Sequence, residues 1–202
     1  MAGHSARSLF DKNMESATHC LNLFDGVEKL NPRGVDLTWI LRAGVVFVVS
    51  ALDTYFHDKI KYRVGKYSLT NLPPALAKFE IKIAKISAWD EAERKGNVLR
   101  NWVTEELSTV PLQSPERIAD ALKLGGIDGV WATIEPDNNA RKDLLDKFNS
   151  LIKRRNQIAH EGDRGQSRKS GKKLRGIDRE FLQDAIVYTT ELVTKIETAF
   201  PM

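Results

Sequence analysis

Hydrophobic residues recur at helical spacing along most of this chain. In the first segment, steps of four, three, four and three residues separate Phe10, Met14, Ala17, Leu21 and Phe24. This spacing places all of them on one face of an α-helix. The pattern therefore predicts a helix over about 5–25, with Ser5 or Ser8 available as its N-cap.

A second and longer apolar run covers about 37–63. The part Val45–Val49 alone fits a strand, but helical spacing continues to Ile60, which is far longer than an ordinary strand. Its most apolar part, Leu37–Leu52, contains Arg42 and is followed by Asp53, so it lacks the roughly 18 uncharged residues that a membrane span needs. We interpret it as a helix of the protein core.

The middle of the chain, 65–138, is less regular. Its apolar spacing predicts short helices over about 76–86, 98–107, 116–123 and 127–134. Ser114 followed by Pro115 is typical of a helix start, because serine caps the first turn and proline has no amide hydrogen to leave unpaired there. Gly125–Gly126 lacks the lysine and the preceding strand of a phosphate-binding P-loop.

Two long helices are predicted to end the chain, over about 141–161 and 178–200. The stretch 162–176 between them is basic, rich in glycine and serine, and is predicted to be a loop. We find no alternating strand pattern and no internal repeat. The sequence thus predicts one all-α domain over 1–202, a helical bundle in which 65–138 is an insertion between the second and third long helices.

The composition excludes several classes of protein. With 202 residues, 42% of them hydrophobic, the chain can bury a core and does not have the composition of a disordered protein. Its single cysteine cannot form an internal disulfide, and its four histidines are too scattered for a zinc finger. Residues 1–13 lack the apolar core of a signal peptide. We therefore expect a cytoplasmic protein with no membrane contact, no metal and no other cofactor.

The positive charge of the chain is concentrated in one segment. The formal net charge is +4, but residues 153–175 hold nine basic side chains against the two acids Glu161 and Asp163. This local excess of +7 leaves the rest of the chain at −3. Such a patch favours a polyanionic partner, although a solvated surface loop explains the charge equally well.

One cation of the helix over 141–161 stands in an unexpected place. On a helical wheel with Leu144 at zero, apolar side chains occupy an arc from about −40° to +100°, and Arg155 falls near its centre, at about 20°. A guanidinium keeps its charge, so it needs an anion, a set of acceptors or another subunit there. Alternatively, Arg155 extends past the end of the core or pairs with a buried acid such as Asp53.

Two polar residues share the adjoining edge of that helix. Asn156 and His160 are four positions apart, at about 120° and 160° on the same wheel. His160 can also be explained as a cation that the helix dipole favours at a C-terminus. About 140° separate it from Arg155, so we expect that one straight helix does not easily bring these two side chains together.

The stretch Arg155–His160 (RNQIAH) resembles the signature of the HEPN superfamily, whose ribonuclease members carry an arginine and a histidine late in the third helix of a four-helix bundle. Residues 42–60 (RAGVVFVVSALDTYFHDKI) resemble the second helix of the RiboL-PSP-type subgroup, and 112–131 (LQSPERIADALKLGGIDGVW) resemble its middle section. The resemblance covers about 10–200 and implies a HEPN-type up-and-down four-helix bundle.

The resemblance also implies a metal-independent endoribonuclease that leaves 2′,3′-cyclic phosphate and 5′-hydroxyl ends. Arg155, Asn156 and His160 are then the catalytic candidates: the histidine for proton transfer, the arginine for the phosphate, and the asparagine to orient the histidine or bind the phosphate. Such enzymes act as homodimers with the two motifs facing each other, which lets Arg155 of one chain and His160 of the other meet at one phosphate.

Further residues are candidates for the RNA site. Basic side chains that can bind flanking phosphates are Lys153, Arg154, Arg164, Arg168, Lys169, Lys172 and Lys173. Asp53, His57 and Glu161 are candidates for supporting the catalytic residues, although a polar stripe on a buried helix and a solvated helix end also explain them.

Three functions fit this sequence. The first is a HEPN ribonuclease, a toxin or antiphage effector held in check by an antitoxin or another regulatory protein. The second is a HEPN module without nuclease activity, in which Arg155 and His160 stabilise a dimeric scaffold that binds RNA or protein. The third is an interaction adaptor with no nucleic acid partner.

Overall fold

The computed structural model of the chain describes residues 5–30, 32–68, 70–80, 89, 91–164 and 174–201. Within these residues the fold is all-α, with eight helices and no strand, as the sequence predicts. The long helices are α1 (Ala6–Glu28), α2 (Thr38–Val64), α8 (Asn138–His160) and α9 (Arg179–Ala199). The insertion holds α3 (Pro74–Ala77), α5 (Lys95–Leu107), α6 (Pro115–Leu124) and α7 (Val130–Ile134).

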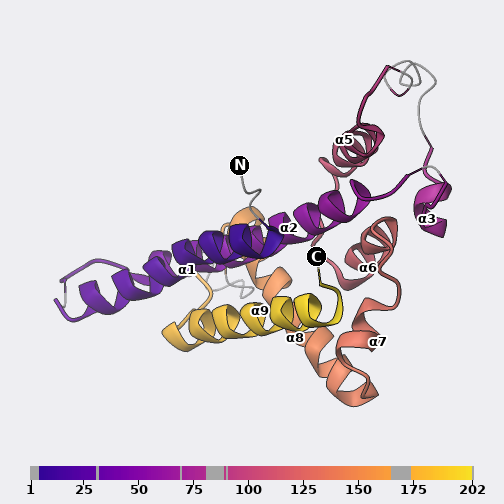
Figure 1. Ribbon diagram of the computed structural model, residues 1–202. Coiled ribbons are helices and arrows are strands. Elements are labelled where there is room, and N and C mark those ends of the chain that lie inside the picture. The colour runs from indigo at the N-terminus through magenta and orange to yellow at the C-terminus, as the bar shows by residue number, and fades with distance from the viewer. Residues whose placement is uncertain are drawn as a thin grey trace.

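Helices α1 and α2 form an antiparallel hairpin, and α9 packs against both of them (Figure 1). The face of α1 that the hydrophobic pattern predicts is the buried one, and it comprises Ala6, Phe10, Met14, Ala17, Leu21 and Phe24. Ser5 is the N-cap, because its side chain accepts a hydrogen bond from the Ser8 amide at 3.1 Å. The same spacing rule therefore accounts for both the helix and its packing.

The core helix is α2, which α1, α5, α6, α8 and α9 contact on different sides. Close packing against α9 explains Gly44, where a Cβ atom would lie 2.5 Å from Cδ2 of Leu182. Among the described residues, α2 is the one helix long and apolar enough to cross a membrane, with a mean hydropathy of 1.4 over its most apolar window. However, 61% of that window is buried inside the structure, which is typical of a core helix.

A buried ion pair attaches the end of α9 to α2. The Lys59 side chain is fully buried, and its Nζ donates to Oε1 of Glu197 at 2.9 Å and to the Phe200 carbonyl at 2.5 Å. The Tyr55 hydroxyl donates to the same Glu197 oxygen at 2.8 Å. Burial lowers the pKa of Lys59, and its partner carboxylate opposes that shift. A buried ammonium needs such partners, so these contacts fix the C-terminal end of α9.

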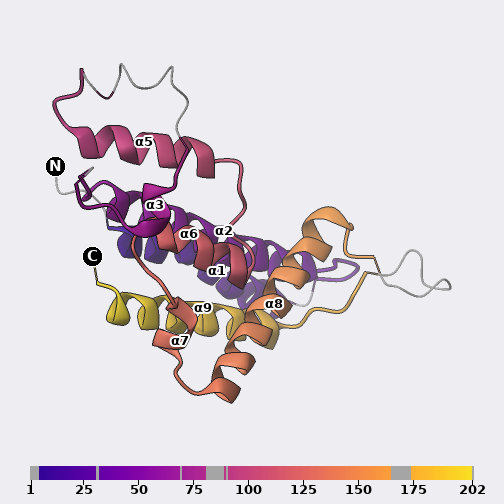
Figure 2. The ribbon, with the colours of Figure 1, turned by 90° about the vertical axis from the view of Figure 1, so that its right-hand side faces the viewer.

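The insertion packs on the C-terminal part of α2 (Figure 2). The predicted start of α6 is confirmed, because the Arg117 amide donates to Oγ of Ser114 at 3.3 Å. The helix predicted over about 76–86 is wrong in its extent, since α3 ends at Ala77 and Phe79 packs against the core from a non-helical position. Residues 81–86 of that prediction lie outside the described residues.

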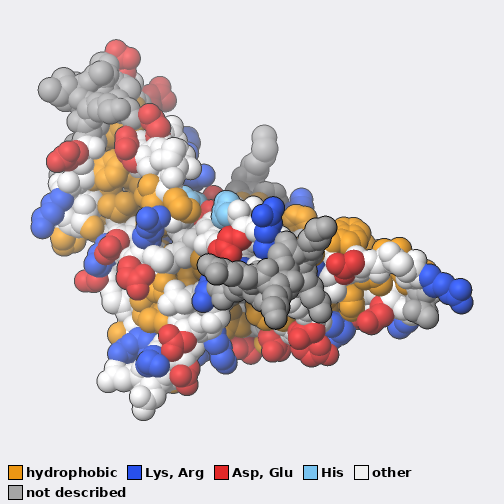
Figure 3. Space-filling model, turned by 180° about the vertical axis from the view of Figure 1, so that it is seen from behind, with side chains coloured by type: hydrophobic (Ala, Val, Ile, Leu, Met, Phe, Trp, Pro, Cys, Tyr) orange, Lys and Arg blue, Asp and Glu red, His pale blue; other side chains and the backbone are white. Residues whose placement is uncertain are grey.

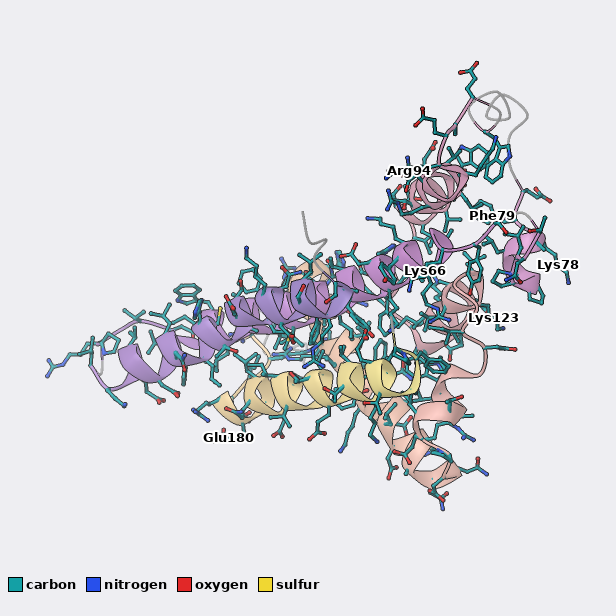
Figure 4. The ribbon with its side chains drawn as sticks, viewed as in Figure 1. Lys66, Lys78, Phe79, Arg94, Lys123 and Glu180 are labelled. Carbon is teal, nitrogen blue, oxygen red and sulfur yellow. The ribbon has the colours of Figure 1, made fainter. Side chains whose placement is uncertain are left out.

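Labelled side chains show how the insertion is placed in the molecule. Lys78 and Phe79 next to α3, Arg94 before α5, and Lys123 on α6 gather at one end, whereas Glu180 lies at the start of α9, toward the other end (Figure 4). α8 contacts α2, α6 and α7, and a groove of about 660 Å³ lies between α8 and α9, which the Tyr188 hydroxyl bridges by donating to the Leu144 carbonyl at 2.9 Å. The last turns of α8 lie against the insertion, because Nη1 of Arg155 contacts Gln113.

Candidate functional site

The motif occupies the C-terminal end of α8. His160 is the last helical residue, and Gly162 and Asp163 beyond it have positive φ angles of 59° and 53°. Left-handed residues of this kind turn the chain out of a helix. The stretch Arg155–His160 is therefore followed by a sharp turn, and the imidazole at its end is exposed.

Arg155 and His160 meet within one chain. Nη1 of Arg155 lies 3.4 Å from Nε2 of His160, and it donates to Oδ1 of Asn156 at 3.1 Å and to Oε1 of Gln113 at 3.3 Å. The expectation that a single helix holds the arginine and the histidine apart is wrong. The angle of about 140° describes positions on the backbone, and the long arginine side chain spans it. A set of acceptors, and not Asp53, partners this guanidinium.

Gln113 is the site residue that sequence reasoning missed. It belongs to the insertion, and its neighbour Leu112 is buried and donates its amide hydrogen to Oδ1 of Asp53 at 2.7 Å. Asp53 thus holds the backbone that carries Gln113, and His57, one turn further along α2, lies 3.9 Å from the same carboxylate. No sequence pattern joins Gln113 to Arg155, because 42 positions separate them.

Arg155 keeps an unpaired donor. Its Nε atom is buried and has no hydrogen-bond partner among the described residues, whereas the contacts above all use Nη1. A buried donor without an acceptor costs roughly 1–3 kcal/mol. Nε and Nη2 form the edge of a guanidinium that suits two oxygens of one phosphate or carboxylate. The conformation therefore leaves the buried Nε of Arg155 without a partner in the described part of this chain.

The neighbouring arginine has a different role from the one expected. Arg154 is 9% exposed and donates from Nη1 and Nη2 to both carboxylate oxygens of Asp163, with 3.0 Å between Nη2 and Oδ2. Arg42 of α2 donates from Nε to the same Oδ2 at 2.5 Å. A buried ion pair thus holds the side chain that is predicted from the sequence to bind a flanking phosphate. We call Arg42, Arg154 and Asp163 the Asp163 clamp.

The Asp163 clamp also closes the base of the basic loop. Nη2 of Arg42 donates to the Arg175 carbonyl at 2.7 Å, and Nη2 of Arg154 donates to the Gly176 carbonyl at 3.1 Å. The Arg175 amide in turn donates to the Asp163 carbonyl at 2.8 Å. The two ends of the loop therefore lie together, directly after the motif.

Electrostatics keep the clamp ionised. Burial raises the pKa of the Asp163 carboxyl, but hydrogen bonds and charge from Arg154 and Arg42 outweigh it and hold the pKa below its ordinary value. The carboxylate is therefore negative at neutral pH and pairs with both buried guanidinium groups. Sequence reasoning noted Arg42 only as a charge in an apolar run, because nothing local connects it to Asp163.

Other predicted site residues lie on the last turns of α8 or directly after them. Lys153 and Arg164 are exposed, and Glu161 accepts a hydrogen bond from Nη1 of Arg175 at 2.9 Å. Four predicted residues lie outside the described part of the chain: Arg168, Lys169, Lys172 and Lys173. In the described residues, no group of three or more His, Cys, Asp or Glu side chains is placed to hold a metal ion.

The face of the molecule drawn in Figure 3 shows histidine side chains beside Lys and Arg side chains and close to a band of hydrophobic ones. On α2, Trp39 and Phe47 are 58% and 43% exposed, which is high for large hydrophobic side chains. Two such side chains on one helix make this part of α2 a candidate interaction surface.

Comparison with known proteins identifies the family. The family model described as RiboL-PSP-HEPN matches residues 10–200, almost the whole chain. The chain belongs to this family. No curated protein and no solved structure matches it. In this RiboL-PSP-HEPN protein the four long helices α1, α2, α8 and α9 form the bundle, and HEPN domains are often ribonucleases or nucleotide-binding domains.

Proposed function

We propose that this RiboL-PSP-HEPN protein is an endoribonuclease that cleaves RNA without a metal ion. The 2′-hydroxyl of one nucleotide attacks the adjacent phosphorus, so that a P–O2′ bond forms and the P–O5′ bond breaks. A base takes the proton of the 2′-hydroxyl, and an acid gives a proton to the departing 5′-oxygen. The products carry 2′,3′-cyclic phosphate and 5′-hydroxyl ends.

The motif supplies groups suited to each of these needs. An imidazole exchanges protons near neutral pH, and His160 is exposed at the end of α8, where RNA can reach it. Arg155 stabilises the negative charge that builds on the phosphate oxygens. Asn156 accepts a hydrogen bond from Nη1 of Arg155 at 3.1 Å and so keeps the guanidinium beside the histidine.

The proposal rests on the state of the Arg155 guanidinium. Its Nη1 lies 3.4 Å from Nε2 of His160, while its buried Nε has no partner among the described residues. Arg154 and Arg42, which hold the fold together, direct their donors to Asp163 and to backbone carbonyls. A phosphate oxygen is an acceptor that would satisfy the remaining donors of the Arg155 guanidinium and would also lie next to His160.

A second copy of the chain is the proposed partner. Trp39, Val46, Ser50 and His57 lie within about 20° of one line along α2, and none of them is buried. This stripe begins at the exposed Trp39 and reaches the neighbourhood of Asp53, whose carboxylate holds Leu112 beside the site. We propose that two protomers pack along the stripe and bring their motifs together.

The cellular role we propose is that of a cytoplasmic toxin or antiphage effector. A ribonuclease that acts on general RNA would damage the cell that makes it. Its activity therefore needs control, and we propose an antitoxin or another regulatory protein as a further partner.

One observation favours a second function, a HEPN scaffold that binds RNA or protein without cleaving RNA. The contact of 3.3 Å between Nη1 of Arg155 and Gln113 ties the insertion to α8, which is what a purely structural arginine does. In such a scaffold the motif would maintain the fold or the dimer, and removing His160 would leave RNA binding and RNA integrity unchanged.

The test is to incubate purified protein with a mixed RNA pool in excess chelator and to identify the product ends. We expect the wild type to produce 2′,3′-cyclic phosphates and His160→Ala to produce none while keeping its melting temperature. His19→Ala removes an exposed histidine of α1 and serves as the matched control, which we expect to cleave normally. Cleavage that survives in His160→Ala contradicts the proposed role, and intact RNA in every sample favours the scaffold.

A further inference from the structure

We propose that Gln113 positions Arg155 for phosphate binding, which makes the insertion a part of the RNA site. The inference rests on the proposed function, because it names a residue that supports the same phosphate. Oε1 of Gln113 accepts a hydrogen bond from Nη1 of Arg155 at 3.3 Å. The glutamine thus acts through the arginine and is a positioning residue.

The chain on either side of this glutamine is fixed. Before it, the Leu112 amide donates to Asp53 at 2.7 Å and the leucine side chain is buried. After it, Ser114 caps α6, and Nε1 of Trp131 donates to the Pro115 carbonyl at 2.9 Å. Contacts from α2, α6 and α7 therefore hold the short segment that carries the glutamine against the end of α8.

The Gln113 contact restricts how the guanidinium can turn. Nη1 carries two hydrogens, and the acceptors on Gln113 and Asn156 lie closer to it than Nε2 of His160, at 3.3 and 3.1 Å against 3.4 Å. These two side-chain oxygens can take both hydrogens, which leaves the imidazole nitrogen available for a substrate proton. Rotation of the guanidinium would break both bonds, so the edge formed by Nε and Nη2 of Arg155 keeps one orientation.

Substitutions of Gln113 distinguish the effect of its hydrogen-bond acceptor from the effect of its side-chain volume. Gln113→Leu keeps a similar volume but removes the acceptor, and we expect kcat for RNA cleavage to fall about 10- to 100-fold, because loosely held catalytic groups lose that much. In an Arg155→Lys background the same change should have no further effect, since Gln113 acts through the arginine. Gln183→Leu on α9 is the matched control, and we expect it to leave kcat unchanged.

Gln113→Glu tests the same contact with a charge added. Its carboxylate still accepts from Arg155, so we expect kcat to recover much of what the leucine variant loses. The negative charge beside the phosphate should raise KM instead. If Gln113 only stabilised the fold, Gln113→Glu would not change kcat and KM in these different ways. The effect of Gln113→Leu would then also not depend on Arg155.

A second readout does not require cleavage. The NMR signal of the Arg155 Nε–H group, assigned by its loss in Arg155→Lys, should shift when inorganic phosphate is added to the wild type. In Gln113→Leu we expect the same shift to require at least about tenfold more phosphate. Loss of one hydrogen bond to a charged group lowers an affinity by about that factor. The melting temperature shows whether each variant is folded.

The outcomes distinguish the two proposals. If the wild type cleaves no RNA but Gln113→Leu weakens the phosphate response, the nuclease function fails and the positioning role stands. If the wild type cleaves RNA and a folded Gln113→Leu matches it in both kcat and phosphate response, the positioning role is overturned. Additive losses in the double variant with Arg155→Lys also overturn it.

Discussion

Arg42 and Asp163 are 121 positions apart in the chain, yet Nε of the arginine lies 2.5 Å from Oδ2 of the aspartate. Arg154 binds the same carboxylate, so one buried anion joins α2, the end of α8 and the base of the basic loop. Asp163 has a positive φ of 53°, a conformation that aspartate tolerates better than most residues. The Asp163 clamp therefore helps to decide where α8 ends and in which direction the basic loop leaves it.

Removing the charge of Asp163 should destabilise the protein strongly. Asp163→Asn leaves two guanidinium groups buried without an anion, and we expect the free energy of unfolding to fall by about 3–5 kcal/mol. Glu161→Gln is the control, because its ion pair with Arg175 is 55% exposed on the glutamate side and should contribute less than about 1 kcal/mol. Urea unfolding at neutral pH measures both changes, and equal losses would contradict a special role of the clamp.

The Asp163 clamp should also make the free energy of unfolding depend on pH in the acidic range. The pKa of Asp163 in the folded protein lies below its ordinary value, so its stabilising effect is complete above the pKa of an unfolded aspartate, about 3.9. That stability is lost as the pH falls through the lower folded pKa. We expect the wild type to lose stability more steeply than Asp163→Asn below about pH 4. Parallel curves of unfolding free energy against pH would exclude Asp163 as the cause.

A lysine at position 155 should not support RNA cleavage at the wild-type rate. Arg155→Lys keeps the charge but loses the planar edge that binds two phosphate oxygens, and we expect the cleavage rate to fall about 10²–10³-fold. Arg117→Lys makes the same change at an exposed position of α6 and should cleave like the wild type. Rates measured with a labelled RNA decide this prediction, and a fully active Arg155→Lys would contradict the role of the guanidinium edge.

The basic loop should contribute to RNA affinity by binding phosphates. In His160→Ala, which we expect to keep RNA intact, exchange of Arg168, Lys169, Lys172 and Lys173 for glutamine should flatten the slope of log affinity against log salt. For single-stranded RNA the slope changes by about 0.7 for each phosphate that the protein no longer binds. Exchange of four exposed cations elsewhere, Lys12, Lys29, Arg33 and Lys78, is the control. An unchanged slope would make the loop a solvated segment that does not bind RNA.

Trp39 should matter for assembly and not for folding. It is 58% exposed on α2, so Trp39→Asp should fold, but a charge in the proposed interface should turn a dimer into a monomer. Leu30→Asp is the control, because Leu30 is 78% exposed outside the stripe. Light scattering gives the mass of each variant. A wild-type monomer, or a dimer that survives Trp39→Asp, would contradict the proposed interface.

Much of the helical architecture could be predicted from local pattern. The spacing of Phe10, Met14 and Leu21 predicted the buried face of α1, and Ser114 before Pro115 predicted the start of α6. These features depend on residues within one or two turns, so periodicity and capping chemistry describe them. The short α3 was overestimated, because its end depends on how Phe79 packs against the rest of the protein.

The sequence by itself determined that the chain is all-α, that Arg155 lies in an apolar arc, and that a basic segment follows His160, because helical period and charge are local properties. Only the tertiary structure decided that Gln113 contacts Arg155 and that Arg154 and Arg42 share the carboxylate of Asp163. Those contacts join α2, the insertion and α8. Which of two adjacent arginines is used for the fold, and which keeps a donor free, depends on the partners that distant segments bring within hydrogen-bond distance.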